Sequence, residues 1–150
     1  MKIVLISCVS KKAKLRDTEK IEAKNLYTST LFKSAWKYAE QMSPDKIYIL
    51  SAKHKLLNPE TKIESYNETL NKMSVSAQKD WAEDVLKQLK AEGLDLQNDE
   101  FIILAGKNYY KNIIGEGKIE NYTLPYSGLK GIGYILKFLK EKNNDTIKKY

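Results

Sequence analysis

Three short runs of apolar residues stand out along the chain, and each predicts a buried β-strand. The runs are Lys2–Ser7, Lys46–Leu50 and Phe101–Leu104. Their apolar residues follow one another with little alternation, which is typical of strands covered on both faces of a sheet. A fourth and shorter strand is expected at Tyr122–Leu124.

Between these runs, apolar residues recur at the spacing of amphipathic helices. Thr28 or Ser29 can cap a first helix, and Ser74 or Ser76 a second, because their hydroxyl oxygens accept hydrogen bonds from the free N–H groups of a first turn. Gly93 is placed to end the second helix. The pattern predicts helices that run to about residue 42, from about 74 to 93, from 109 to 114, and from 134 through 139.

Strands that alternate with helices predict an α/β fold. We expect a single three-layer domain, residues 1–139, with a mainly parallel sheet and helices on both faces of that sheet. Residues 140–150 are polar, and we expect this end of the chain to fray.

Two segments lack a clear pattern. Residues 10–25 are polar and rich in lysine, and their position after the first strand would allow residues 11–24 to form a lid over a site there. Residues 54–72 are irregular over a length that, in a compact domain, is more often functional than idle.

The composition is that of a globular protein, with 42% hydrophobic and 30% charged residues among 150. No apolar run approaches the roughly 20 residues needed to cross a bilayer. The single cysteine excludes an internal disulfide. We therefore expect a cytoplasmic protein with no membrane partner.

The chain carries a formal net charge of +7, and nearly all of its positive charge is lysine, since Arg16 is the only arginine. Lysine acts as a point charge suited to phosphate, whereas arginine is preferred for reading bases. A nucleic acid would thus be held mainly through its backbone, with a strong dependence on salt. Abundant solvated surface lysine is an equally good explanation of this charge.

Polar and reactive side chains follow each of the three main strands. The segments are Ser7–Lys12, Ser51–His54 and Ala105–Tyr110. Because ligands of open α/β sheets bind beyond the carboxyl ends of the strands, these segments predict one composite site. They locate a site without naming a reaction.

Several of these side chains suit an anionic ligand that carries an aromatic base. Lysines would meet the anion, serines would donate hydrogen bonds or cap the turns, and Tyr66 would stack on a base. The segment Gly128–Gly133 precedes a helix and resembles a phosphate cradle, although its spacing matches neither the dinucleotide fingerprint nor the P-loop. The expected ligand-binding residues are Cys8, Ser10, Lys11, Ser51, Lys53, Tyr66, Gly106, Tyr109, Gly128 and Lys130.

His54 is the only histidine, and its pKa would suit proton transfer or a phosphate contact, the latter being favoured here. Cys8 is more often a packing residue than a nucleophile in such a position, and one cysteine with one histidine does not make a dyad. No metal or other cofactor is expected, although Glu64 and Glu68 leave a carboxylate-only magnesium site open.

The order of these motifs resembles a small bacterial and phage family of α/β proteins of unknown function. The resemblance rests on Cys8–Lys12, Leu26–Phe32, Leu50–Pro59 and Ala105–Tyr110, together with Tyr66, Thr69-Leu70, Pro125, Gly128-Leu129 and Ile132-Gly133. It covers roughly residues 1–139. The family's layout is similar to that of the peroxide-stress protein YaaA and, more remotely, to uracil-DNA-glycosylase-like folds, which is an analogy of fold alone.

The chain departs from the family pattern at three positions. The family usually has glycine where Lys55 stands, an acidic residue where Asn67 stands, and often tyrosine where His54 stands. If an acid at position 67 activates water in the family, Glu64 or Glu68 would have to do so here.

Two functions remain open from the sequence. One is an enzyme that acts on a nucleotide or nucleic-acid base by hydrolysing or exchanging an N-glycosidic bond. In that hypothesis His54 or Lys53 steadies the phosphate or the leaving group, and Asn67 with Glu64 or Glu68 orients water. The other is a module that binds a nucleotide or nucleic acid without chemistry.

Overall fold

The computed structural model of the chain describes residues 1–8 and 12–148. A five-stranded sheet forms its centre, in the order β4-β3-β1-β6-β7. Four strands are parallel and β4 lies antiparallel at one edge. The strands are β1 (Lys2–Ser7), β3 (Lys46–Ser51), β4 (Lys55–Leu57), β6 (Glu100–Leu104) and β7 (Tyr122–Thr123).

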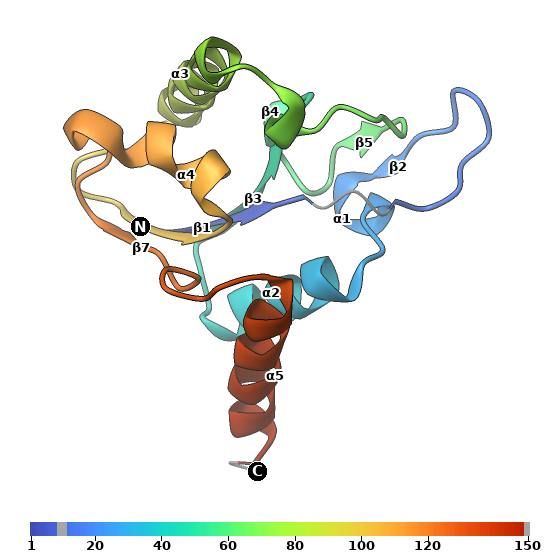
Figure 1. Cartoon of the computed structure of the whole chain (residues 1–150), viewed down its shortest axis with the longest axis vertical. Coiled ribbons are helices and arrows are strands. Elements are labelled where there is room, and N and C mark those ends of the chain that lie inside the picture. The colour runs from blue at the N-terminus through green and yellow to red at the C-terminus, as the bar shows by residue number, and fades with distance from the viewer. Residues whose placement is uncertain (9–11, 149–150) are drawn as a thin grey trace.

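Helices cover both faces of this sheet, which confirms the expected single α/β domain (Figure 1). On one face α2 packs against α5, and on the other α3 packs against α4. Their bounds are α2 (Thr30–Gln41), α3 (Val75–Ala91), α4 (Lys107–Ile114) and α5 (Ile132–Lys148), with a short 3-10 helix η2 (Gly115–Gly117) after α4.

The predicted helix ends are confirmed where a capping serine or a glycine marks them. The Ser29 hydroxyl accepts a hydrogen bond from the Phe32 N–H at 3.1 Å and begins α2. The Ser74 hydroxyl begins α3 in the same way. Gly93 follows α3 with a φ of 83°, a left-handed conformation that favours glycine at helix ends.

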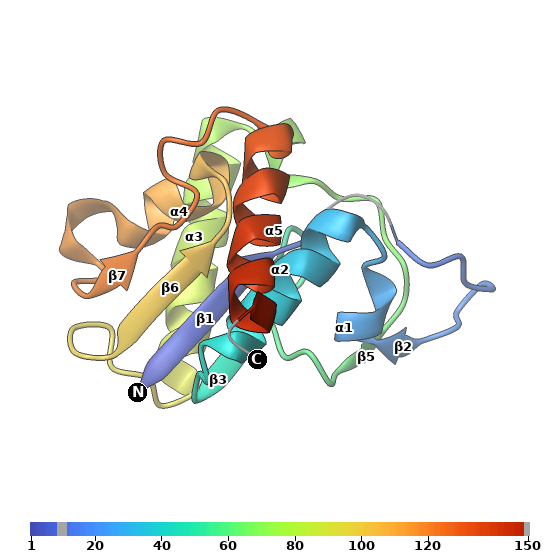
Figure 2. The same cartoon turned by 90° about the horizontal axis from the view of Figure 1, so that it is seen from below.

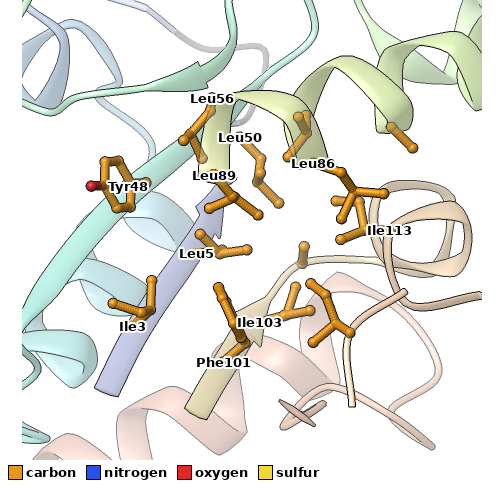
Figure 3. Close-up of a cluster of buried hydrophobic side chains, with 14 of the residues drawn as sticks. Ile3, Leu5, Tyr48, Leu50, Leu56, Leu86, Leu89, Phe101, Ile103 and Ile113 are labelled. Carbon is orange, nitrogen blue, oxygen red and sulfur yellow. The ribbon is translucent and has the colours of Figure 1, made fainter. Parts of the chain in front are cut away.

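Alternate side chains of the strands enter two separate hydrophobic cores. Ile3, Leu5 and Ile103 face α3 and α4, in the core drawn in Figure 3. Val4 and Ile6 face α2 and α5. Because successive strand residues point to opposite faces, uninterrupted apolar strands fill both cores at once.

The two segments without a clear pattern contain short elements. In the first lie β2 (Ile21–Glu22) and α1 (Ala23–Leu26), and in the second lie β4, β5 (Lys62–Ile63) and the 3-10 helix η1 (Leu70–Lys72). β2 pairs with β5 in a small antiparallel ribbon beside the main sheet. The described chain just before β2 projects away from the sheet on the side of this ribbon (Figure 2).

The polar end of the chain is helical where it is described. α5 continues past Leu139 to Lys148. Asn143 is buried, and its side-chain amide donates to the Ser34 carbonyl at 3.3 Å, which ties this half of α5 to α2. Among the described residues, no helix has the length and apolar content that a membrane span requires.

Candidate functional site

The carboxyl ends of β3, β1 and β6 lie side by side at one edge of the sheet, because these strands are neighbours. Cys8 follows β1 and its N–H donates to the Leu50 carbonyl at 3.1 Å, so the pairing with β3 extends beyond the strand. The predicted positions Cys8, Ser51 and Gly106 therefore share this edge.

Tyr66 lies at the centre of a buried hydrogen-bond network at this edge. Its hydroxyl lies 2.8 Å from Ser51 Oγ, 2.5 Å from the Tyr27 hydroxyl and 3.5 Å from Cys8 Sγ. These partners come from the end of β3, from the chain after α1 and from the end of β1. One phenol thus connects three segments that are distant in sequence.

Ser51 also shapes the hairpin turn between β3 and β4. Its hydroxyl accepts a hydrogen bond from the His54 N–H at 3.0 Å, and its carbonyl accepts one from the Trp81 indole N–H at 2.9 Å. The turn closes at Lys55, whose φ is 64°. A left-handed conformation favours glycine, which accounts for the glycine that the family pattern has at this position.

Tyr66 does not present a free ring for stacking. It is 6% exposed, Lys12 Nζ lies 4.6 Å from the centre of its ring, and the His54 ring meets it edge-on at 5.5 Å. A base could reach this ring only if neighbouring side chains moved. The satisfied hydroxyl explains why Tyr66 belongs to the core although it lies in a segment without regular pattern.

The tyrosines around Cys8 are held in their neutral form. Burial first, and the nearby Cys8 second, raise the pKa of Tyr27, Tyr66 and Tyr109 above the usual value for a phenol. Tyr109 also packs edge-on against the Trp81 ring at a centre distance of 5.6 Å. These phenols can donate hydrogen bonds, and they are not bases at neutral pH.

A cavity of about 220 Å³ lies between the β3–β4 turn and the β2–β5 ribbon. We call it the His54 cavity. Its lining is strongly charged and consists of Lys20, Lys53, His54, Lys62, Ile63 and Glu64. The predicted residues Lys53, His54 and Glu64 are therefore brought together.

His54 is half-buried in the wall of this cavity. Burial lowers its pKa, the positive charge of Lys53 lowers it further, and Glu68 acts in the opposite direction. Its Nε2 is shielded from solvent and has no hydrogen-bond partner among the described residues. The imidazole is thus neutral over most of the physiological pH range, with one nitrogen unsatisfied.

A second cavity, of about 310 Å³, lies between the start of α4 and the turn that leads to α5. We call it the Gly106 cavity. Gly106 and Lys107 contribute from the end of β6, and Gly128 and Lys130 from the turn. The other lining residues are Ala105, Tyr110, Tyr126, Ser127, Leu129 and Ile135.

The backbone around the Gly106 cavity suits an anion. Gly106 is the N-cap of α4, and the first turn of a helix has N–H groups without partners inside the helix. Gly128 has a φ of 84°, which lets the turn fold tightly opposite that helix end. Lys107 and Lys130 supply positive charge, and no carboxylate is found among the described lining residues.

The remaining predicted residues are dispersed. Asn67 and Glu68 are exposed and line neither of these two cavities. Cys8 and Ser51 belong to the buried network, and the partly buried Tyr109 packs against Trp81. Ser10 and Lys11 lie outside the described residues. Within the described chain, no group of three His, Cys, Asp or Glu side chains could hold a metal ion.

Several lining residues of the two cavities are not among the ligand-binding residues predicted from the sequence. Lys107 and Tyr110 directly continue the polar segment after β6, so their positions were a usable signal. Lys20 and Lys62 are brought together by the two-residue pairing of β2 with β5, which is too short to leave a hydrophobic pattern.

Comparison with known proteins places the chain in a family without an assigned function. The model of a family of unknown function, DUF6884, matches residues 3–141. The chain is also similar to the uncharacterized protein YfjM of Bacillus subtilis (strain 168), with 29% identity over 127 residues, which cover 82% of this chain and 81% of that protein. The expected membership of a small family of unknown function is thereby confirmed.

Proposed function

We propose that this chain, which belongs to the family of unknown function DUF6884, binds a nucleotide in the Gly106 cavity. The observation that carries the proposal is the convergence of two lysines, a helix N-terminus and a glycine turn on one cavity of about 310 Å³. That volume is at the lower end of the range for small-molecule sites. The phosphate would lie against the first turn of α4 and between Lys107 and Lys130.

The base would lie against tyrosine rings in the same cavity. Tyr110 is half-buried and lines the cavity beside Gly106, whereas Tyr126 is buried more deeply. Aromatic rings stack on any base, and they contribute about 1–3 kcal/mol per base where this has been measured by substitution. Tyr110 therefore takes the stacking role that the sequence suggested for Tyr66.

Calorimetric titration with nucleosides and nucleoside monophosphates tests this proposal. Replacing Lys130 by Gln should weaken nucleotide binding about tenfold, since a hydrogen bond to a charged group contributes about 1.5–3 kcal/mol. Lys137→Gln is the matched control, because this lysine is exposed on α5 and does not line the cavity. Equal affinity for nucleosides and nucleotides, or no binding of either, would refute the proposal.

A second candidate function is hydrolysis of an N-glycosidic bond at the His54 cavity. The observation that favours it is that Glu64 and His54 line one cavity with Lys53. Glu64 would orient water toward the sugar carbon, and Lys53 would hold the phosphate. Because Asn67 and Glu68 do not line this cavity, Glu64 is the carboxylate best placed for that work.

Release of free base from nucleotides and oligonucleotides, measured by chromatography, tests this second function. Glu64→Gln should abolish base release, whereas Glu120→Gln, an exposed carboxylate elsewhere, should leave it unchanged. If wild-type protein releases no base from any substrate while still binding nucleotides, the protein is a binding module without this chemistry.

A further inference from the structure

We propose that the His54 cavity is a separate binding site for the phosphate group of a phosphate ester. Three lysines, Lys20, Lys53 and Lys62, line it against one carboxylate, Glu64. The inference does not depend on a nucleotide in the Gly106 cavity, which has a different lining. It shares its cavity with the proposed hydrolysis but does not depend on it, because phosphate binding needs no chemical step.

The walls of the His54 cavity are fixed by the fold. On one side, the His54 N–H donates to Ser51 Oγ at 3.0 Å, and Gln88 Nε2 donates to the His54 carbonyl at 3.5 Å. On the other side, Ile63 is 5% exposed and pairs with Ile21 in the ribbon. These hydrogen bonds and this strand pairing therefore fix the two backbone segments that carry the lysines on either side of the cavity.

The charge around the cavity is unbalanced. Each of the three lining lysines is exposed, and none of them forms an ion pair with a described carboxylate. A fourth cation, Lys12, lies over the ring of Tyr66, which itself contacts the His54 ring. A phosphate would be attracted by this group of cations and repelled by Glu64 in the lining, by the nearby Glu68, and by Glu22, which pairs with Lys62 in the ribbon.

His54 gives the site a side chain whose charge can change. Burial first, and Lys53 second, lower its pKa and so disfavour its protonated form. An anion in the cavity would offset the charge of Lys53 and favour the imidazolium. Of the sequence-based roles for His54, this geometry supports the phosphate contact.

The size of the cavity limits the ligand. About 220 Å³ accommodates a phosphate and part of an attached sugar, and it is small for a complete nucleotide. The phosphate could belong to a small ester or to a nucleic-acid backbone. The two sources differ in their salt dependence, because a polymer releases many counterions on binding.

Proton NMR of His54 tests the site directly, since this residue is the only histidine in the chain. Inorganic phosphate should move the imidazole signal with saturation and shift its titration midpoint to higher pH. Chloride at the same ionic strength should not. Lys53→Gln and Lys62→Gln should each weaken the effect about tenfold, as expected for the loss of one charge-assisted contact.

One further variant should act in the direction opposite to the lysine variants, and another is a matched control. Glu64→Gln removes the carboxylate from the cavity and should tighten phosphate binding, whereas Lys37→Gln, on the exposed face of α2, should change nothing. An imidazole response no larger than in chloride, or one unchanged in both cavity lysine variants, would overturn the proposal.

Two further experiments distinguish phosphate binding in the His54 cavity from nucleotide binding in the Gly106 cavity and identify the source of the phosphate. Lys130→Gln should leave the His54 response intact, and loss of the response in this variant would overturn the proposal by placing the anion in the Gly106 cavity. A short oligothymidylate supports a nucleic-acid backbone as the source if it binds more tightly than phosphate with a steep salt dependence. A shallow dependence and equal affinity support a small phosphate ester.

Discussion

The hydroxyl of Tyr66 lies 2.8 Å from Oγ of Ser51, so a segment without regular pattern is tied to the end of a central strand. Ser51 is fully buried, and its hydroxyl also receives the His54 N–H. This relationship fixes the β3–β4 turn and, with it, the wall of the His54 cavity. Tyr66 is therefore a positioning residue for that cavity.

Replacing Tyr66 by Phe should lower the free energy of unfolding by about 1–3 kcal/mol, because the hydroxyls of Tyr27 and Ser51 lose a buried partner. Urea denaturation followed by circular dichroism measures this change. Tyr122→Phe is the matched control, since Tyr122 is 42% exposed, and it should change stability by less than about 0.5 kcal/mol. Equal effects of the two variants would show that the network does not stabilise the fold.

Replacing Lys55 by Gly should raise the free energy of unfolding by about 0.5–1 kcal/mol. A left-handed backbone conformation costs a residue with a side chain roughly 1–2 kcal/mol, and glycine removes this cost. Glycine is also more flexible in the unfolded chain, which cancels a part of the gain. The ion pair of Lys55 with Asp84 at 3.3 Å is exposed and contributes little. Lys53→Gly, in the same turn without a positive φ, should bring no such gain in thermal denaturation.

The pKa of His54 should respond to its two charged neighbours in opposite directions. Lys53→Gln should raise this pKa and Glu68→Gln should lower it, because Lys53 disfavours the imidazolium and Glu68 favours it. Proton NMR of the single histidine measures both. A pKa that is the same in the two variants and in the wild type would mean that burial alone determines it.

The same pKa predicts how stability depends on pH. The folded state binds a proton at His54 less readily than the unfolded state, whose pKa is about 6.5. The contribution of this residue is therefore complete above pH 6.5, and it is lost as the pH falls below that value through the folded pKa. Urea denaturation of the wild type and of His54→Gln should show a smaller fall for the variant across this range.

The layers of the fold were predictable because burial leaves a pattern that can be read along the chain. Ile3 to Ile6 are buried without interruption, which required helices on both faces of the sheet. β2 and β5 could not be predicted, because two residues each are too few to display a period. Their pairing is nevertheless what brings Lys20 and Lys62 to His54.

The sequence predicted one composite site, and the structure divides its residues between two cavities and a buried network. Gly106, Gly128 and Lys130 were expected as ligand-binding residues, and they do line one cavity. The burial of Tyr66 was not foreseen, because hydrogen bonds between hydroxyls that are distant in sequence have no local signal. α5 extends to Lys148, and Asn143 in this part of the helix is held by a contact with α2 that the polar sequence does not reveal.

Gly106→Ala separates binding from folding more cleanly than a charge substitution does. Gly106 has a φ of −76°, which alanine adopts without strain, and a Cβ built there meets no atom within 4 Å. The variant should therefore keep the stability of the wild type. Its methyl group would stand at the N-terminus of α4, where the phosphate is proposed to lie, and it should weaken nucleotide binding at least tenfold in calorimetric titration.

The most direct test of the central claim is an amide chemical-shift titration of the labelled protein with nucleoside monophosphates. The account predicts saturable shifts at Gly106, Lys107 and Gly128 that nucleosides do not reproduce and that Lys130→Gln reduces. Shifts confined to other parts of the chain, or no shifts at millimolar nucleotide, would contradict a nucleotide site in the Gly106 cavity.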